Sequence, residues 1–219
     1  MKTIGVLGLQ GDVSEHMDAV GKIGATALWI KKPSQLRQID ALIMPGGEST
    51  TISNLMVDCG LFDEIKTLGK AGLPILGTCA GAILLAKKGN AQVAKTGQKL
   101  LSLMDMKIGR NAFGRQRESF EAEIEIDGIT DLAGVKKNGR IQNGSIRISS
   151  NKFATTSSPF NAIFIRAPLI EEVFGECIAL ALLGKKIVAA RQKNLLATCF
   201  HPELTDDLRV HKYFYEMIK

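Results

Sequence analysis

The segment from Leu76 to Ala82 (LGTCAGA) constrains the fold more than any other part of the sequence. It continues the apolar run Leu73–Gly77 and leads into a pattern with helical spacing at Ala82–Lys87. Glycines two residues before and after Cys79 permit a sharp turn from a buried strand into a helix, with the cysteine exposed at its apex. We therefore predict that Cys79 lies on such a turn in an α/β fold.

Apolar runs and helical patterns alternate along the first half of the chain. This order predicts a mostly parallel sheet with helices between its strands, and Asp12 precedes the first helix as a candidate N-cap. The predicted strands are Thr3–Leu9, Ala27–Ile30, Ala41–Met44 and Leu73–Gly77, and the predicted helices are Val13–Ile23 and Leu61–Lys70.

The second half has closely spaced strand patterns instead. Gly184-Lys185 suits a tight turn between two of them, so antiparallel strands are expected at one side of the sheet. The last segment, Asp206–Ile218, has the spacing of an amphipathic helix, with its apolar face supplied mostly by Leu208, Val210, Tyr213, Phe214 and Met217. The strand patterns are Phe120–Ile126, Ile178–Leu183, Lys186–Arg191 and Leu195–Phe200.

A chain of 219 residues is long enough to bury the core of one α/β domain. We predict a single domain over residues 1–219, with a mostly parallel central sheet flanked by helices, antiparallel additions and a flavodoxin-like three-layer architecture. Residues 134–159 are rich in Ser, Asn, Lys and Gly and are predicted to form a surface insertion.

Composition narrows the classes of function. No apolar run reaches the roughly 18 to 20 residues of a membrane span, and the N-terminus has no pattern of a secretory signal. The four scattered cysteines indicate neither a disulfide framework nor a CxxC metal site, so a cytoplasmic protein is expected. The net charge of +6 is dispersed and aromatic residues are few, which disfavours nucleic-acid binding and favours a basic surface, with an acidic protein as a conceivable partner.

Cys79 is the best candidate for a nucleophile. At the start of a helix, unpaired N–H groups and the helix dipole favour a thiolate. The alternative is a structural cysteine buried in a glycine-rich turn. The strand, the turn and the helix together favour the nucleophile.

His201 is the candidate base for this nucleophile. The run Leu195–Phe200 brings it to the end of a strand, where sites in α/β proteins form. Pro202 favours an extended backbone at His201, and residues two apart on an extended chain project to the same side, so Glu203 is expected to contact His201. This would be the orienting carboxylate of a triad, although a capped turn is an alternative explanation for His-Pro-Glu.

The other histidines and the cysteine nearest His201 are expected to be structural. His16 and His211 fall within helical patterns, where a hydrogen-bonded or solvent-facing imidazole is the usual finding. Cys199 belongs to an apolar strand without a turn and is expected in the core.

Two glycines, Gly46 and Gly47, follow the strand Ala41–Met44 and precede a helix that begins with Ser49 and Thr50. Glycine lets backbone N–H groups approach a ligand or a developing oxyanion closely. A phosphate loop is the rival interpretation, but its lysine is missing, so an oxyanion hole is favoured.

Together these motifs resemble the class I glutamine amidotransferases and, more narrowly, the glutaminase subunits of pyridoxal 5′-phosphate synthase. The resemblance covers most of residues 3–131 and 161–219. The motifs that carry it are Gly8–Asp12 (GLQGD), Pro45–Thr51 (PGGESTT), Gly77–Gly81 (GTCAG), Arg110–Gln116 (RNAFGRQ) with Glu118–Phe120 (ESF), Phe164–Pro168 (FIRAP) and His201–Glu203 (HPE).

The resemblance implies a glutaminase whose ammonia passes to a (β/α)₈ synthase subunit, which makes pyridoxal phosphate from a pentose phosphate and a triose phosphate. No cofactor and no metal are expected. It implies the catalytic triad Cys79, His201 and Glu203. It implies oxyanion donors at the backbone N–H groups of Gly47 and Ala80, with Gln10 nearby in support. Around the substrate glutamine it implies Gly47, Glu48, Ser49, Arg110, Ile165 and Arg166.

The chain departs from the pattern at two places. Compact members of the family largely lack the stretch 134–159, which lies away from every motif, and Gly109 replaces an acidic residue often found before Arg110.

Three other functions compete. His-x-Glu occurs in zinc deaminases, but their Pro-Cys-x-x-Cys motif is absent. A non-catalytic regulatory subunit is disfavoured because all three triad residue types are present. An amidotransferase that feeds a different synthase is disfavoured by the segment Arg110–Gln116.

Overall fold

The computed structural model describes residues 1–110, 119–129 and 158–219. The predicted insertion at 134–159 lies outside the described residues, apart from Ser158 and Pro159. Most of the motif Arg110–Gln116 is outside them as well, and only Arg110 is described.

Five neighbouring strands form the main parallel part of a ten-stranded sheet. Their order is β2-β1-β3-β4-β12, and each pairs with its neighbour in parallel. The strands are β1 (Thr3–Leu7), β2 (Thr26–Ile30), β3 (Ala41–Met44), β4 (Ile75–Thr78) and β12 (Leu195–Thr198). These strands have continuous apolar runs instead of alternating polar and apolar residues, because helices cover both faces of the sheet.

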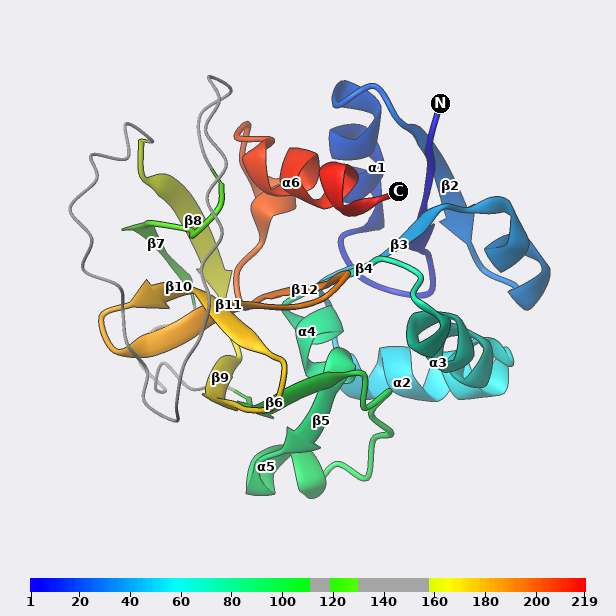
Figure 1. The fold of residues 1–219 in the computed structure, drawn as a ribbon. Helices are drawn as coiled ribbons and strands as arrows, with labels where there is room; N and C mark the ends of the chain where they lie inside the picture. The colour runs from blue at the N-terminus through cyan, green and yellow to red at the C-terminus, as the bar shows by residue number, and fades with distance from the viewer. Residues whose placement is uncertain (111–118, 130–157) are drawn as a thin grey trace.

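Helices cover the two faces of this parallel part (Figure 1). Helices α1 (Val13–Lys22) and α6 (Arg209–Met217) lie on one face, and the other face carries α2 (Ser49–Asp58), α3 (Leu61–Ala71) and α4 (Ala80–Leu85). The predicted three-layer α/β architecture is therefore confirmed. The remaining helical segments are short: η1 (Pro33–Gln38), α5 (Ala91–Ala94) and η2 (Pro202–Leu204). In the described part of the chain, no helix is both long and apolar enough to cross a membrane.

Antiparallel strands extend one side of the sheet, as predicted. β11 (Lys186–Gln192) pairs antiparallel with β12, with β9 (Leu169–Val173) and with β10 (Ile178–Leu183). β6 (Met104–Gly109) pairs antiparallel with β9 and parallel with β5 (Ala86–Gly89). β7 (Ser119–Ile124) and β8 (Phe160–Ile165) form a separate antiparallel pair.

Two segments differ from their predicted form. The helix after Cys79 runs from Ala80 to Leu85 instead of from Ala82 to Lys87, because Ala86 turns to extended backbone and enters β5. Asp12 occupies the N-cap position of α1, but its side chain makes no capping hydrogen bond.

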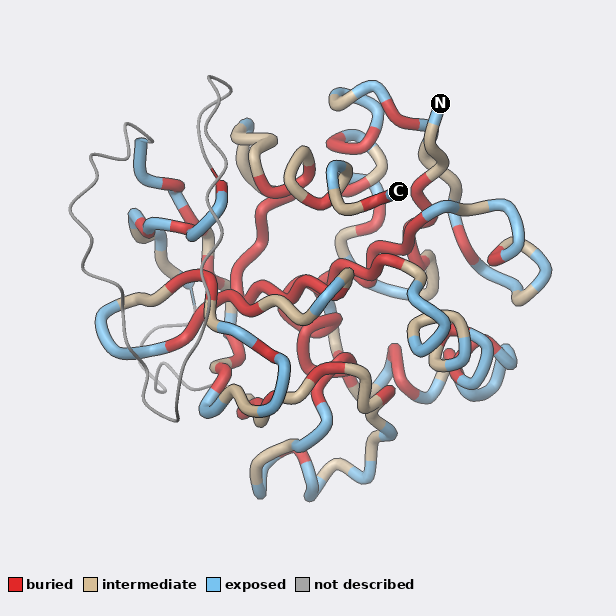
Figure 2. Tube along the Cα trace, in the orientation of Figure 1, coloured by how far each residue is buried: buried red, intermediate tan, exposed pale blue. Residues whose placement is uncertain are grey.

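The centre of the sheet is the most deeply buried part of the described structure (Figure 2). Ile43 of β3, Leu76 of β4 and Leu196 of β12 are all within 1% of full burial. Because β1, β3, β4 and β12 run in one direction, their carboxyl ends share an edge, and the loops that follow them meet there. This edge positions the candidate site.

Candidate active site

Cys79 lies at the apex of a sharp turn between β4 and α4. Its φ of 48° and ψ of −100° belong to a region that side-chain-bearing residues rarely adopt. A Cβ at Gly77 would stand 2.6 Å from the Gly81 carbonyl, and a Cβ at Gly81 would stand 2.1 Å from the Met44 carbonyl oxygen. Only glycine fits these two positions, which is why the predicted turn requires both of them.

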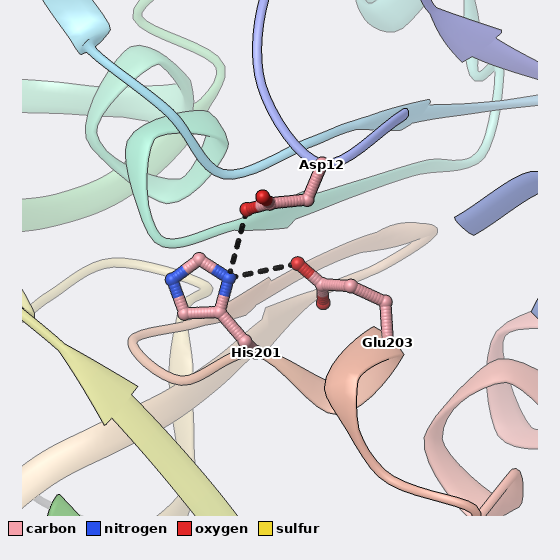
Figure 3. A group of neighbouring side chains, drawn as sticks. All are labelled: Asp12, His201 and Glu203. Atoms are coloured by element: carbon pink, nitrogen blue, oxygen red, sulfur yellow. Dashed lines mark hydrogen bonds and ion pairs between the residues drawn. The ribbon is translucent and has the colours of Figure 1, made fainter. Parts of the chain in front are cut away.

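His201 and Glu203 follow β12 and contact each other as predicted. The Nδ1 atom of His201 lies 2.8 Å from Oε1 of Glu203, and both residues are buried (Figure 3). The predicted reason was wrong, because Glu203 lies in the 3₁₀ turn η2 and not on an extended chain. Pro202 starts that turn, and its fixed φ is suited to the first position of a helical segment.

Burial and the polar neighbours of His201 have opposite effects on the pKa of its imidazole. Burial lowers its pKa, but hydrogen bonds to Asp12, Cys79 and Glu203 and the charge of Glu203 outweigh burial, so the pKa is raised above its ordinary value. Burial alone would raise the pKa of Glu203, whereas its histidine neighbours hold the pKa below the usual range. A carboxylate only accepts, so Nδ1 of His201 carries a proton and Nε2 is left for the Cys79 thiol.

Asp12 is a site residue that the sequence reasoning missed. Its Oδ2 atom lies 3.2 Å from Nδ1 of His201, so two carboxylates face one ring nitrogen (Figure 3). The signal was present, because Asp12 follows β1 at the same sheet edge as the triad, but its place before a helix suggested a cap.

Asp12, His201 and Glu203 also bring three potential metal-ligand atoms within 4.8 Å of one another. Both carboxylates share Nδ1 of His201, and the 2.8 Å approach of Glu203 is a hydrogen-bond distance. A metal bound there would have to displace the Nδ1 proton, so the arrangement fits an orienting hydrogen bond better than a metal centre.

A cleft of about 360 Å³ opens above Cys79 and collects almost every predicted site residue. Glu203 is absent from its wall because it lies behind His201. The lining residues are Gln10, Gly11, Asp12, Gly47, Glu48, Ser49, Cys79, Ala80, Ile83, Arg110, Ile165, Arg166, Pro168 and His201. A larger but more open hollow of about 570 Å³ beside Trp29 contains none of the triad residues.

The glycine loop after β3 is held from the loop after β1. The Glu48 backbone N–H donates to Oε1 of Gln10 at 2.8 Å. Gly47 has a φ of 143°, and a Cβ there would stand 2.5 Å from the same Gln10 oxygen. Ala80 is the first residue of α4, where a backbone N–H has no intrahelical acceptor. Both predicted oxyanion donors therefore border the cleft.

Charged groups lie together at one wall of the cleft. Arg110 places Nη2 2.9 Å from Oε1 of Glu48, while the other Glu48 oxygen accepts from the Thr51 N–H at 2.7 Å and caps α2. Burial raises the pKa of Glu48, but the Thr51 bonds and Arg110 outweigh it and lower the pKa overall. The pair offers one cation and one anion, which are the groups needed to recognise the charged end of an amino acid.

The remaining predicted residues occupy the same cleft with different partners. The Ser49 hydroxyl donates to Gln98 Oε1 at 2.9 Å. The Ile165 carbonyl lies 3.9 Å from the Cys79 sulfur, and Arg166 has an unusual φ of 40°. Cys199 is fully buried, and burial raises its pKa, in agreement with its predicted place in the core.

Comparisons with known proteins agree with this geometry. Residues 6–219 match the model of the SNO glutamine amidotransferase family. Pyridoxal 5′-phosphate synthase subunit PdxT of Pelotomaculum thermopropionicum is 46% identical, covering 97% of this chain and 93% of that protein. The PdxT of Thermococcus kodakarensis is 45% identical and covers 98% of both chains. A crystal structure of a glutamine amidotransferase matches with a TM-score of 0.81 and 38% identity over 98% of both chains. The chain therefore belongs to the SNO glutamine amidotransferase family.

Proposed function

We propose that this chain is the glutaminase subunit of a pyridoxal 5′-phosphate synthase. It hydrolyses L-glutamine to L-glutamate and ammonia and delivers the ammonia to the synthase subunit. The observation that carries the proposal is that Cys79 and His201 line one cleft, with Glu203 hydrogen-bonded to His201, in a chain 46% identical to a named PdxT.

The reaction begins from a thiolate: His201, whose pKa is raised, holds the proton of Cys79 on Nε2, and the sulfur attacks the side-chain amide carbon of glutamine. The resulting oxyanion is stabilised by backbone N–H groups of Gly47 and Ala80. His201 then gives the proton to the departing nitrogen, the C–N bond breaks, and ammonia leaves a γ-glutamyl thioester on Cys79. Water, deprotonated by His201, attacks the thioester and releases glutamate.

Glu203 keeps His201 ready for both proton transfers. Its short hydrogen bond to Nδ1 fixes the tautomer in which Nε2 faces the thiol, and its negative charge stabilises the imidazolium formed after the first transfer.

Glutamine is recognised by charged residues that line the cleft. Arg110 and Arg166 are the cations available for its α-carboxylate, and Glu48 is the anion available for its ammonium group. Gln10 supports the site through the loop of Gly47. The same proposal makes residues 1–219 one amidotransferase domain, which is supported by a single hydrophobic cluster that joins strands of both halves.

The partner is the synthase subunit in a hetero-oligomeric complex. The four cysteines are all free thiols, which supports a location in a reducing compartment, the cytoplasm.

The proposal is tested by following ¹⁵N from the side-chain amide of glutamine into pyridoxal phosphate. The chain is mixed with a synthase subunit, the two sugar phosphates and glutamine labelled with ¹⁵N in its side-chain amide. We expect ¹⁵N in the pyridoxal phosphate, and none when Cys79→Ala replaces the parent. Unlabelled ammonium salts should restore product formation with the variant. Product that stays unlabelled with an active synthase would refute the proposal.

A further inference from the structure

The second carboxylate oxygen of Glu203 faces a buried pair of histidines that the proposed mechanism does not use. His16 on α1 places Nε2 3.3 Å from Oε2 of Glu203, and its Nδ1 lies 3.0 Å from Nε2 of His211 on α6. His16 is 0% exposed and His211 is 1% exposed. The two helices at opposite ends of the sequence thus meet directly behind the triad.

His16 also contacts the residue that precedes the nucleophile. Its Nε2 lies 3.1 Å from Oγ1 of Thr78, the last residue of β4, which is fully buried. One ring nitrogen therefore reaches both the strand that carries Cys79 and the carboxylate that orients His201.

The positions of the protons follow from the partners. A carboxylate only accepts hydrogen bonds, so Nε2 of His16 must carry a proton to approach Glu203 favourably. The 3.0 Å hydrogen bond between Nδ1 of His16 and Nε2 of His211 can run in either direction, according to the tautomers of the two rings. Nδ1 of His211 is buried without a hydrogen-bond partner among the described residues. Burial, followed by the charge of the neighbouring His16, lowers the pKa of His211, so His211 stays neutral.

Glu203 has few other restraints. It lies in a three-residue turn, its side chain is fully buried, and its Oε1 is engaged by His201. Rotation about its last side-chain bond would exchange or misalign the two oxygens. Oε2 makes no hydrogen bond to any described residue, and Nε2 of His16, 3.3 Å away, is the polar contact that opposes this rotation and keeps Oε1 on the base.

We propose that His16, itself held by His211, is a positioning residue that fixes the carboxylate of Glu203 and so aligns His201 with Cys79. This inference rests on the proposed function, because the alignment matters only if His201 transfers protons during glutamine hydrolysis. His16 and His211 touch no reacting atom. Their effect should therefore appear in the rate of the chemical steps and not in glutamine binding.

The first test compares variants of His16 in the presence of the synthase subunit. His16→Leu removes the polar contact with Glu203, and we expect kcat to fall about 10- to 100-fold, the usual range for a polar partner outside the reacting groups, with KM changed less than about twofold. His16→Gln retains an N–H near the position of Nε2 and should recover most of kcat. Val20→Ala, one turn later on α1 and fully buried, is the matched control that loses packing but should keep the parent kcat.

A double-mutant cycle separates positioning from general damage. If His16 acts through Glu203, His16→Leu should change kcat less than about twofold when Glu203→Gln is already present. The same fold loss in both backgrounds would overturn the inference, as would a parent-like kcat in His16→Leu.

A readout without turnover distinguishes this inference from the proposed function. In protein with ¹⁵N-labelled histidine, His16→Leu should shift the Nδ1–H resonance of His201, whereas Val20→Ala should leave it unchanged. An unshifted His201 resonance overturns the inference whatever the activity. A parent that fails to hydrolyse glutamine with its synthase counts against the proposed function alone.

Discussion

Asp12 and Glu203 approach the same nitrogen of His201, at 3.2 and 2.8 Å, but they do so from very different surroundings. The side chain of Glu203 is fully buried, whereas that of Asp12 is 36% exposed and borders the open cleft. The charge of a buried carboxylate is screened less by water, so Glu203 is the stronger orienting partner.

Because Glu203 is more buried than Asp12, we expect replacement of Glu203 to lower kcat more than replacement of Asp12. We expect Glu203→Gln to lower kcat about 100-fold or more, because removal of a triad's third member weakens the base, and Asp12→Asn to lower it less than about tenfold. Steady-state glutamate release with the synthase subunit measures both, and Asp18→Asn at the exposed side of α1 is the control. A larger loss in Asp12→Asn would make Asp12 the orienting carboxylate.

Thiol labelling should separate the four cysteines by environment. Iodoacetamide should inactivate the protein in step with alkylation of Cys79, as followed by peptide mass mapping. Exposed Cys59 should react without loss of activity, and Cys177 and Cys199 should stay unmodified because burial raises the pKa of both thiols and keeps them protonated. Inactivation that follows Cys59 or Cys199 instead would move the nucleophile.

The glycine at Gly81 should be irreplaceable. A Cβ there would meet the backbone oxygen of Met44 at 2.1 Å, and a backbone atom cannot move aside cheaply. Gly81→Ala should therefore cost about 3 kcal/mol or more of unfolding free energy, or prevent folding. Gly21→Ala on α1 has open space and should be neutral or stabilising by up to about 1 kcal/mol. Chemical denaturation of both variants checks the difference, and equal stability would contradict the steric argument.

His211 should make folding stability depend on pH. Its pKa falls from the ordinary value of 6.5 to about 3, through burial and then through His16, while Glu203 acts in the opposite direction. Between these two values the unfolded chain binds one more proton than the folded chain, so stability is lost as pH falls, by about 1.4 kcal/mol per pH unit.

His211→Gln keeps a side chain that can hydrogen-bond His16 but removes the titration. Urea unfolding at pH 7, 6 and 5 should therefore give a shallower pH slope for this variant than for the parent. Identical slopes would show that His211 does not titrate between the folded and unfolded states.

The Gly46-Gly47 peptide suggests that the partner controls the reaction. Gly47 has a φ open only to glycine, and a glycine peptide can point its N–H toward or away from the substrate at small cost. Contacts with the synthase that favour the competent orientation by a few kcal/mol would raise turnover by orders of magnitude. We expect weak activity alone and a rise on adding synthase. A rate that is high without the partner and flat across the titration would rule out this control.

Much of the fold could be predicted from sequence because its signals are local. The four early strands and the helices α1 and α3 lie within a few residues of their predicted bounds. The predicted strand Leu195–Phe200 was grouped with the antiparallel strands, and β12 does pair antiparallel with β11, but it also pairs in parallel with β4. Sheet partners depend on contacts between distant segments, so the spacing of strands along the chain does not reveal them.

In the candidate site, too, local sequence patterns reveal some residues, while others are recognised only from contacts between distant segments. Cys79 and the pair His201 and Glu203 are marked by glycine spacing and by a short motif. His16 and His211 are separated by 195 residues, and nothing in a helical pattern reveals that two helices bring these side chains together. Asp12 was assigned to a helix cap because a cap is a local role, whereas its contact with His201 is a tertiary one.

The most direct measurement is glutamate release at saturating glutamine and saturating synthase subunit, for the parent and for Cys79→Ala. Circular dichroism should first show that both proteins are folded alike. The account predicts sustained glutamate release by the parent and none above background by the variant, while free ammonium salts still support the synthase. Release at the parent rate by Cys79→Ala would contradict the assignment of Cys79 as the nucleophile.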